Sequence, residues 1–272
     1  MRKLAVVGAA VLGAMLAVAG IAYAANTYTS TGKITPSKSG TSAKPTPIAI
    51  ALTFTVGDTA GNRPSSLKTY AVGFGPGVVP NTAVAKGCNS TQANKQILPS
   101  TCSKRASAGG ANIGTGSVNA LAGTSTDPTQ KIPCFLKVTL VNSTKRNHLW
   151  IRVDGVTSGP PGKTCPLAQH SAIDATFTKL RSVPKKGGGT VPSYALKFTV
   201  PPNLIRNSGL DVAVIHDVTN VSKVSKRIGR VTHGYLETVG CPKTPSGKRK
   251  ADVTFTSAAG QTVTSSSTSA CS

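Results

Sequence analysis

Apolar side chains alternate with polar or small ones through much of this chain, and this pattern limits the fold more than any other feature of the sequence. Successive side chains of a β-strand point to opposite faces, so each alternating row predicts a strand with one buried face. The rows that share this alternation are residues 48–56, 70–74, 136–140, 149–153, 173–177, 194–200, 212–214 and 251–255. No window shows a sustained helical period, and the best position for a short helix is residues 90–97.

Turn-forming residues separate these rows. Gly, Pro, Asn and Asp gather in residues 57–62, 142–147, 184–189 and 258–261, as is typical of hairpin connections. Strands joined in this way predict an all-β fold, an antiparallel, immunoglobulin-like β-sandwich.

The sequence leaves the number of domains open. Residues 48–272 form either one elongated sandwich or two packed halves divided near residue 130, because no long linker marks a boundary. Residues 25–47 are polar, and we expect an edge strand followed by a flexible segment there.

The N-terminus has the layout of a secretory signal peptide. Arg2 and Lys3 precede a charge-free apolar run over residues 4–21, and the small residues Ala22 and Ala24 follow at the positions that a signal peptidase requires. The alternative is a permanent membrane anchor, because the run approaches the ~20 residues of a membrane span. The high Ala and Gly content favours cleavage after Ala24. We therefore predict a secreted or cell-envelope protein with no membrane span after cleavage.

Six cysteines follow this segment: Cys88, Cys102, Cys134, Cys165, Cys241 and Cys271. An even number of cysteines in an exported protein predicts disulfides, and none of these spacings matches the close pairs of a zinc site. Nearest-neighbour pairing (88–102, 134–165 and 241–271) is favoured because each bridge closes a short loop. Each bridge would contribute about 3 kcal/mol in the loop-entropy description.

The chain is strongly basic, with a formal net charge of +23. Losing the two charges of Arg2 and Lys3 with the signal peptide would leave +21. Such a charge predicts attraction to anionic cell-wall or surface polymers, although it could also serve solubility alone. The candidates for binding an anionic surface are Lys223, Lys226, Arg227, Arg230, Lys248, Arg249 and Lys250. Aromatic residues make up only 4% of the chain and no recognition helix is evident, which argues against specific nucleic-acid binding.

The sequence contains no convincing catalytic motif, and we predict no catalytic residue, cofactor or metal. Residues 158–164 resemble a phosphate-binding loop, but Thr157 replaces its first glycine and no helix follows. The four histidines are isolated, and there is no G-x-S-x-G elbow. Asp211 and Asp217 would share one strand face at a distance of ~20 Å, whereas a glycosidase pair needs roughly 5 to 10 Å.

Trp150 is the only tryptophan, and Arg152 follows it on the row predicted to face outward. The two residues are a possible ligand-binding pair if Trp150 is an exposed platform for sugar stacking. The favoured alternative is that Trp150 covers the sheet beneath a loop.

Three short segments resemble uncharacterised exported proteins of actinobacteria. They are Leu-Pro-Ser-Thr-Cys at residues 98–102, Asn-Ile-Gly-Thr-Gly-Ser-Val at 112–118 and Tyr-Leu-Glu-Thr-Val-Gly-Cys-Pro at 235–242. The last is similar to a closing segment in which Cys-Pro precedes a two-stranded hairpin and a final cysteine. The resemblance implies an all-β secreted protein and supports pairing Cys241 with Cys271. It implies no activity, and Cys134 departs from its pattern.

These features predict a secreted, non-enzymatic protein with a structural, adhesive or ligand-binding role at the cell envelope. The alternative is a secreted hydrolase or carbohydrate-binding module with an unrecognised site.

Overall fold

The structure, a computed structural model, describes residues 25–272 except residues 161, 168–169 and 245–246. The predicted signal peptide at residues 1–24 lies outside the described residues. The strands of the main sheet are β1 (Asn26–Thr35), β3 (Ala49–Asp58), β4 (Leu67–Gly73), β6 (Asn112–Thr124), β7 (Ile132–Asn142), β8 (His148–Gly155), β9 (His170–Pro184), β10 (Thr190–Thr199), β11 (Arg206–Asn207), β12 (Leu210–Val221), β16 (Lys248–Ser257) and β17 (Thr262–Ala270).

Two smaller sheets and a few short helices complete the fold. The strands of the smaller sheets are β2 (Thr46–Pro47), β5 (Val78–Pro80), β13 (Ser225–Ile228), β14 (Val231–Gly234) and β15 (Leu236–Thr238). The helices are η1 (Thr82–Val84), α1 (Ser90–Ala93), α2 (Ser100–Ser103), η2 (Ala106–Ala108) and α3 (Pro202–Ile205). The short helix expected within residues 90–97 is confirmed over its first turn as α1.

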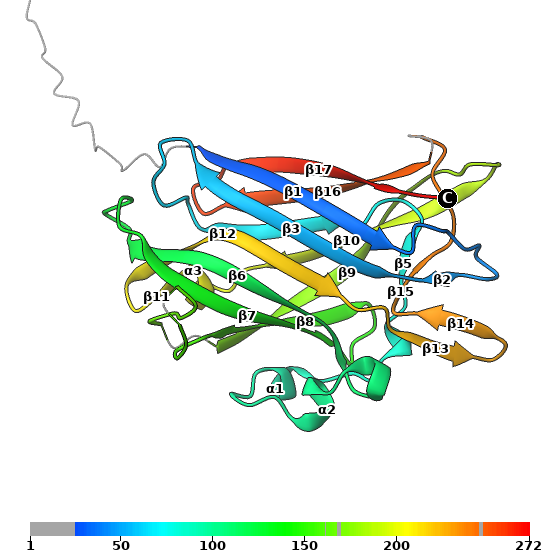
Figure 1. Cartoon of the computed structure of the whole chain (residues 1–272), viewed down its shortest axis with the longest axis horizontal. Helices are drawn as coiled ribbons and strands as arrows, with labels where there is room; N and C mark the ends of the chain where they lie inside the picture. Colours follow the sequence, from blue (N-terminus) through cyan, green and yellow to red (C-terminus); the bar gives the residue numbers. More distant parts are fainter. Residues whose placement is uncertain (1–24, 161, 168–169, 245–246) are drawn as a thin grey trace, which may run out of the picture.

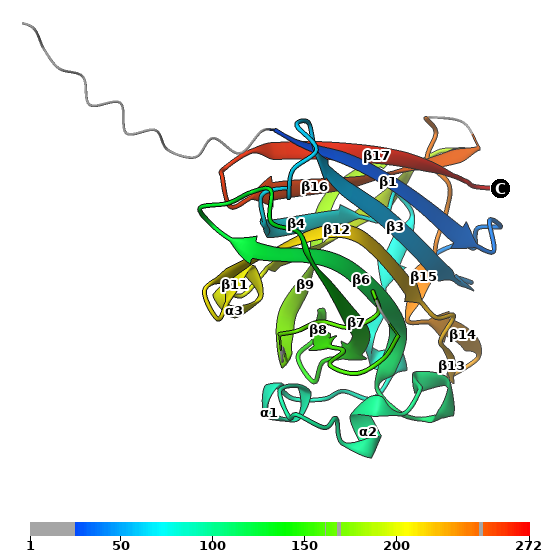
Figure 2. The same ribbon diagram turned by 60° about the vertical axis from the view of Figure 1, so that its left-hand side comes forward.

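The main sheet has 12 strands in the order β1-β3-β12-β6-β7-β8-β9-β10-β4-β16-β17, with β11 beside β12. Figures 1 and 2 show the sheet curling round so that β17 returns beside β1. The expected all-β antiparallel fold is confirmed. The finer prediction of an immunoglobulin-like sandwich is replaced by one nearly closed, barrel-like sheet, because the strands pair continuously instead of forming two facing sheets.

Strands β1 and β17 form the seam where the sheet nearly closes. They are not joined as ladder neighbours in the strand order. Side chains connect them instead: the hydroxyls of Ser30 and Ser265 hydrogen-bond at 2.9 Å, and the Gln261 carboxamide bonds the backbone N–H and C=O of Asn26 at 2.9 and 3.2 Å. At the end of the seam, the Ser39 N–H donates to the Ser272 carbonyl at 2.6 Å.

Residue 130 lies between β6 and β7, which pair with each other from Ala122 and Ile132 to Asn112 and Val141. The chain on both sides of the suggested division near residue 130 therefore belongs to the same sheet.

The two ends of the curled sheet carry different covers. The α3 end holds helix α3, the start of β1 and the turn between β16 and β17; Leu204 of α3 is buried there in the core. At the other end, which we call the C-terminal end, the small sheet β2-β15-β5 packs against the interior through Ile48, Val78 and Leu236. Inward side chains between these covers form one continuous apolar core.

Residues 81–111, with η1, α1, α2 and η2, form an outer layer beneath β7 and β8 in Figure 1. A second apolar cluster joins this layer to the sheet, and it contains Cys88, Ala93, Cys102, Ala111, Val141 and Trp150. The outer layer therefore covers the side chains of β7 and β8 that point away from the main core.

Three disulfides join Cys88 to Cys102, Cys134 to Cys165 and Cys241 to Cys271, which confirms the predicted pairing. Disulfides of this kind indicate an oxidising, extracellular environment. Among the helices of the described part of the chain, none has the length and apolar character required to cross a membrane.

Candidate functional site: the interior cavity

The curled sheet encloses an apolar cavity of about 160 Å³. Aliphatic and aromatic side chains from most strands of the sheet line it, among them Phe54, Tyr70, Leu149, Ile151, Phe177 and Val253. An apolar cavity of about 150 Å³ in another protein stays dry and accepts benzene, so a space of this size suits a small apolar group.

Aromatic rings fill the α3 half of the interior. Phe255 lies 5.2 Å from Phe54 and 5.5 Å from Tyr70 between ring centroids, and it stacks on Tyr28 at 4.9 Å. Towards the C-terminal end, the inward positions of β17 carry only serines, which occupy less volume. Rings are present at this end too, since Phe177 lies 5.9 Å from Phe74 and 6.3 Å from Tyr235 between ring centroids.

Asp217 is the carboxyl group among the residues that line the cavity. The side chain of Asp217 is 7% exposed, and burial raises its pKa to about 7. The Thr219 hydroxyl donates to Asp217 Oδ1 at 2.8 Å and partly offsets this rise. Asp217 is therefore a proton-exchanging group inside an apolar space near neutral pH.

The expectation that Asp211 and Asp217 share a strand face is wrong. The register of β12 against β6 shifts between Val214 and His216, as a β-bulge does. Before this bulge Val212 and Val214 line the cavity, and after it Asp217 and Thr219 do. Strict alternation would place Asp217 on the same outer face as Asp211. The extra residue of the bulge places Asp217 on the inner face instead.

Two further polar side chains are buried at the C-terminal end with few or no partners. Tyr235 lines the cavity with an exposure of 0%, and its hydroxyl has no hydrogen-bond partner among the described residues. Burial raises the Tyr235 pKa far above its ordinary value, so this hydroxyl keeps its proton. Arg249 is also 0% exposed, and among the described residues its side chain donates one hydrogen bond, from Nη1 to the Ala270 carbonyl at 3.3 Å. Its Nε and Nη2 have no partner in the described structure.

No protein-family model, curated protein or solved structure matches this chain. Across residues 25–272, gaps aside, no group of three or more His, Cys, Asp or Glu side chains could hold a metal ion. Function must therefore be argued from the geometry of the cavity and the surface.

The placement of Arg249 corrects its assignment to the anionic-surface candidates. Lys248 and Lys250 are exposed, but Arg249 lies between them on the opposite face of β16 and points inward with Val253 and Phe255. Burial lowers the Arg249 pKa to about 10, so its guanidinium remains charged at neutral pH. The alternation of residues 249–255 is a signal that could have placed Arg249 inside; no pattern in the sequence singles out Tyr235.

The other surface candidates lie where the sequence suggests. Lys223, Lys226, Arg227 and Arg230 are exposed on and beside the β13–β14 hairpin, which stands apart from the main sheet in Figure 1. The structure therefore gathers these four cations in one place and separates Arg249 from them.

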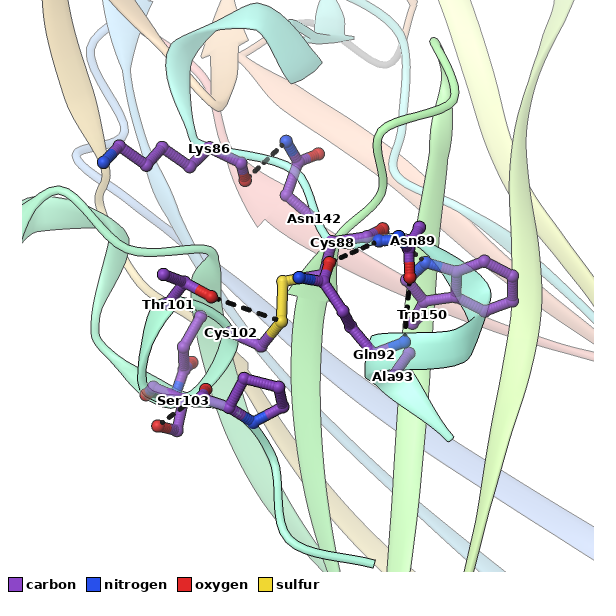
Figure 3. The surroundings of a disulfide bond; sticks show 12 residues. Lys86, Cys88, Asn89, Gln92, Ala93, Thr101, Cys102, Ser103, Asn142 and Trp150 are labelled. Atoms are coloured by element: carbon purple, nitrogen blue, oxygen red, sulfur yellow. Dashed lines mark hydrogen bonds between the residues drawn. A yellow bond between two sulfur atoms is a disulfide. The ribbon is translucent and has the colours of Figure 1, made fainter. Parts of the chain in front are cut away.

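Trp150 and Arg152 lie beneath the outer layer rather than on an open surface. Trp150 is 5% exposed, and its Nε1–H donates to the Cys88 carbonyl at 2.9 Å, beside the Cys88–Cys102 disulfide (Figure 3). Arg152 is 4% exposed and donates to the Asp154 carboxylate at 2.7 Å and to the Gln96 carbonyl at 2.6 Å. The position offers no open face for stacking a sugar, which agrees with the interpretation of Trp150 as a cover for the sheet.

Proposed function

We propose that the protein is a secreted, non-enzymatic binding protein of the cell envelope that holds a small apolar molecule in its interior cavity. The observation that carries this proposal is the apolar cavity of about 160 Å³ inside the curled sheet, with a few polar groups at defined positions. Apolar space with a small number of convergent polar groups is the usual composition of a small-molecule site.

The energetics support an occupant. Protein interiors are normally packed as densely as organic crystals, and an empty cavity costs roughly 24 cal/mol per Å³. A cavity of this size would therefore cost about 4 kcal/mol when empty. A ligand that fills the cavity would recover part of that free energy and stabilise the fold.

The test is a titration of the mature chain with benzene and 1-hexanol, followed by thermal unfolding and by NMR shifts of the methyl groups of Leu136 and Val138. Both compounds should raise the Tm and shift these inward methyls. The Ala251→Leu variant fills the cavity and should abolish both effects. Thr254→Leu, on the outer face of the same strand, should leave them unchanged.

If neither compound binds the wild-type chain at millimolar concentration, the proposal fails. Equal binding to the wild-type chain and the Ala251→Leu variant would place the ligand elsewhere and would also contradict it.

A second candidate function is adhesion to anionic wall or surface polymers through the β13–β14 hairpin. Its support is the cluster of Lys223, Lys226, Arg227 and Arg230, none of which forms an ion pair with a carboxylate of the described residues. Replacing all four with Gln should weaken binding to immobilised polyphosphate and flatten its salt dependence, because exposed charges are screened by salt. Gln at four exposed cations of the outer layer, Lys86, Lys95, Lys104 and Arg105, is the matched control. No binding at low salt would contradict this function.

A secreted hydrolase or carbohydrate-binding module has no observation that favours it among the described residues. The relation to exported actinobacterial proteins stays a hypothesis based on three short segments.

A further inference from the structure

We propose that the ligand is a small amphipathic carboxylate whose acid group binds Arg249 while its apolar part fills the cavity. This inference rests on the proposed function and adds the chemical class of the ligand and the place where its head group lies.

The buried arginines of the described chain show why Arg249 is unusual. Arg63 is 0% exposed and its Nε also has no partner, but its two other guanidinium nitrogens donate to the carbonyls of Thr124, Asp127 and Gln130. Arg152 pairs with a carboxylate. Arg249 has one carbonyl acceptor and no carboxylate partner. A buried charge without a partner is destabilising. We therefore interpret the free Nε and Nη2 of Arg249 as a binding site for an anion.

Other hydrogen-bond donors lie near this end of the molecule. Ser269 is the register partner of Arg249 across β16 and β17, and its hydroxyl is buried without a partner. The hydroxyl of Ser39 is likewise buried and unpartnered, and its backbone bonds to Ser272. Of these donors, Ser269 is the neighbour of Arg249, and the free Tyr235 hydroxyl also lines the cavity; each can donate to an acceptor. A carboxylate has several acceptor positions and no donor, so it matches this set.

The cavity reaches this region. Ser269 lines the cavity, and so does Ala251, which lies two residues from Arg249 on the same face of β16. Arg249 is not itself among the residues that line the cavity, so the acid group of the ligand would extend past Ala251 and Ser269 to reach it.

The charge of Asp217 favours the same orientation. Val253 pairs with Ser265, and Ser265 bonds to Ser30 across the seam. Ser30 pairs with Phe54, which in turn pairs with Asp217, so these residues form one row across the sheet. Arg249 lies four residues further along β16 from this row, which is about 13 Å at the rise of a strand. A carboxylate at Arg249 thus stays away from Asp217, whereas the apolar body of the ligand lies between the two groups.

The seam offers a route for the ligand. Gly32, Lys33 and Ser269 line the cavity where β1 meets β17, and side chains rather than a backbone ladder hold these two strands together. Separating the seam here breaks few backbone hydrogen bonds. Lys33 adds a second positive charge beside this route.

The test compares three compounds of one size: 3-phenylpropanoate, 3-phenylpropanol and 3-phenylpropylamine. Each is titrated at neutral pH into the full mature chain, into Arg249→Met and into Arg181→Met, a control at an exposed arginine of β9. Charge-assisted hydrogen bonds are about twice as strong as neutral ones, so the wild-type chain should bind the acid at least about tenfold more tightly than the alcohol. Arg249→Met should remove this preference and keep the affinity for the alcohol, and Arg181→Met should change neither.

The NMR resonance of the Arg249 Nε–H gives a second measurement on the wild-type chain, which remains informative if Arg249→Met does not fold. It should shift with the acid and not with the alcohol. Equal affinity for acid and alcohol, a preference that survives in Arg249→Met, or tightest binding of the amine would overturn this inference while the cavity function stands. If none of the three compounds binds although benzene does, this inference falls and the cavity function stands; if benzene and 1-hexanol also fail to bind, the proposed function falls as well.

Discussion

The outer layer and the interior cavity both bury charged side chains, but they surround them differently. Beneath the outer layer, every guanidinium nitrogen of Arg152 on β8 has an acceptor, and Asp154 also bonds to His170 Nδ1 at 2.6 Å. In the interior, Arg249 has two nitrogens without a partner, and the Tyr235 hydroxyl has none.

This difference distinguishes buried polar groups that stabilise the fold from those that are available to a ligand. Buried polar groups that hold a fold together are almost always hydrogen-bonded, because an unpartnered one costs about 1–3 kcal/mol. The Arg152 network ties the loop after α1 to β8, so its role is structural. The interior groups contribute no comparable bonding in the described structure, and that is why we assign them to a ligand.

The largest expected effect concerns Asp217. Its pKa is about 7 in the folded protein and near 4 in an unfolded chain, so the folded state holds a proton that the unfolded state releases. The unfolding free energy should therefore fall as the pH rises from about 4 to about 7, by up to ~4 kcal/mol, and then level off. Urea unfolding of wild type and Asp217→Asn across this range measures the effect as the difference between the two curves.

Asp211→Asn, on the other face of β12, is the control and should follow the wild-type curve. If Asp217→Asn and wild type show parallel curves, Asp217 is not buried in an apolar interior and the cavity is misplaced.

The next effect tests the two arginines directly. Arg152→Met should lower the unfolding free energy by about 3 kcal/mol, because it leaves Asp154 Oδ2 and several carbonyls without the donor that Arg152 supplies. Arg249→Met removes a charge that has no carboxylate partner, so it should change the unfolding free energy by less than about 1 kcal/mol or raise it. Guanidinium chloride unfolding without ligand measures both, and equal losses would remove the distinction between the two regions.

The smallest effect concerns a single oxygen atom. Tyr235→Phe deletes a buried hydroxyl that has no partner, so the Tm of the ligand-free protein should stay the same or rise slightly, by the equivalent of about 1 kcal/mol at most. A clear fall in Tm would show that the hydroxyl has a structural partner.

In contrast, Trp150→Phe, which removes the bond to the Cys88 carbonyl, should lower the Tm.

The local structure could be largely predicted from the sequence. The alternation over residues 48–56 corresponds to β3 at Ala49–Asp58, and the row at 251–255 lies within β16 at Lys248–Ser257. The disulfide pairs were predictable because nearest neighbours close short loops. These features depend on interactions between residues close in the chain or on a period that strands impose everywhere.

The sequence by itself therefore determined an antiparallel β protein held by three disulfides. The tertiary structure decided that β1 returns beside β17 to enclose a cavity, because closure depends on which strand edges meet, and alternation is the same in a flat, stacked or curled sheet. It also decided that Asp217 faces inward, since a single bulge in β12 reverses the faces of all later residues. The state of Arg249 likewise exists only in three dimensions, where the described residues supply it with no carboxylate.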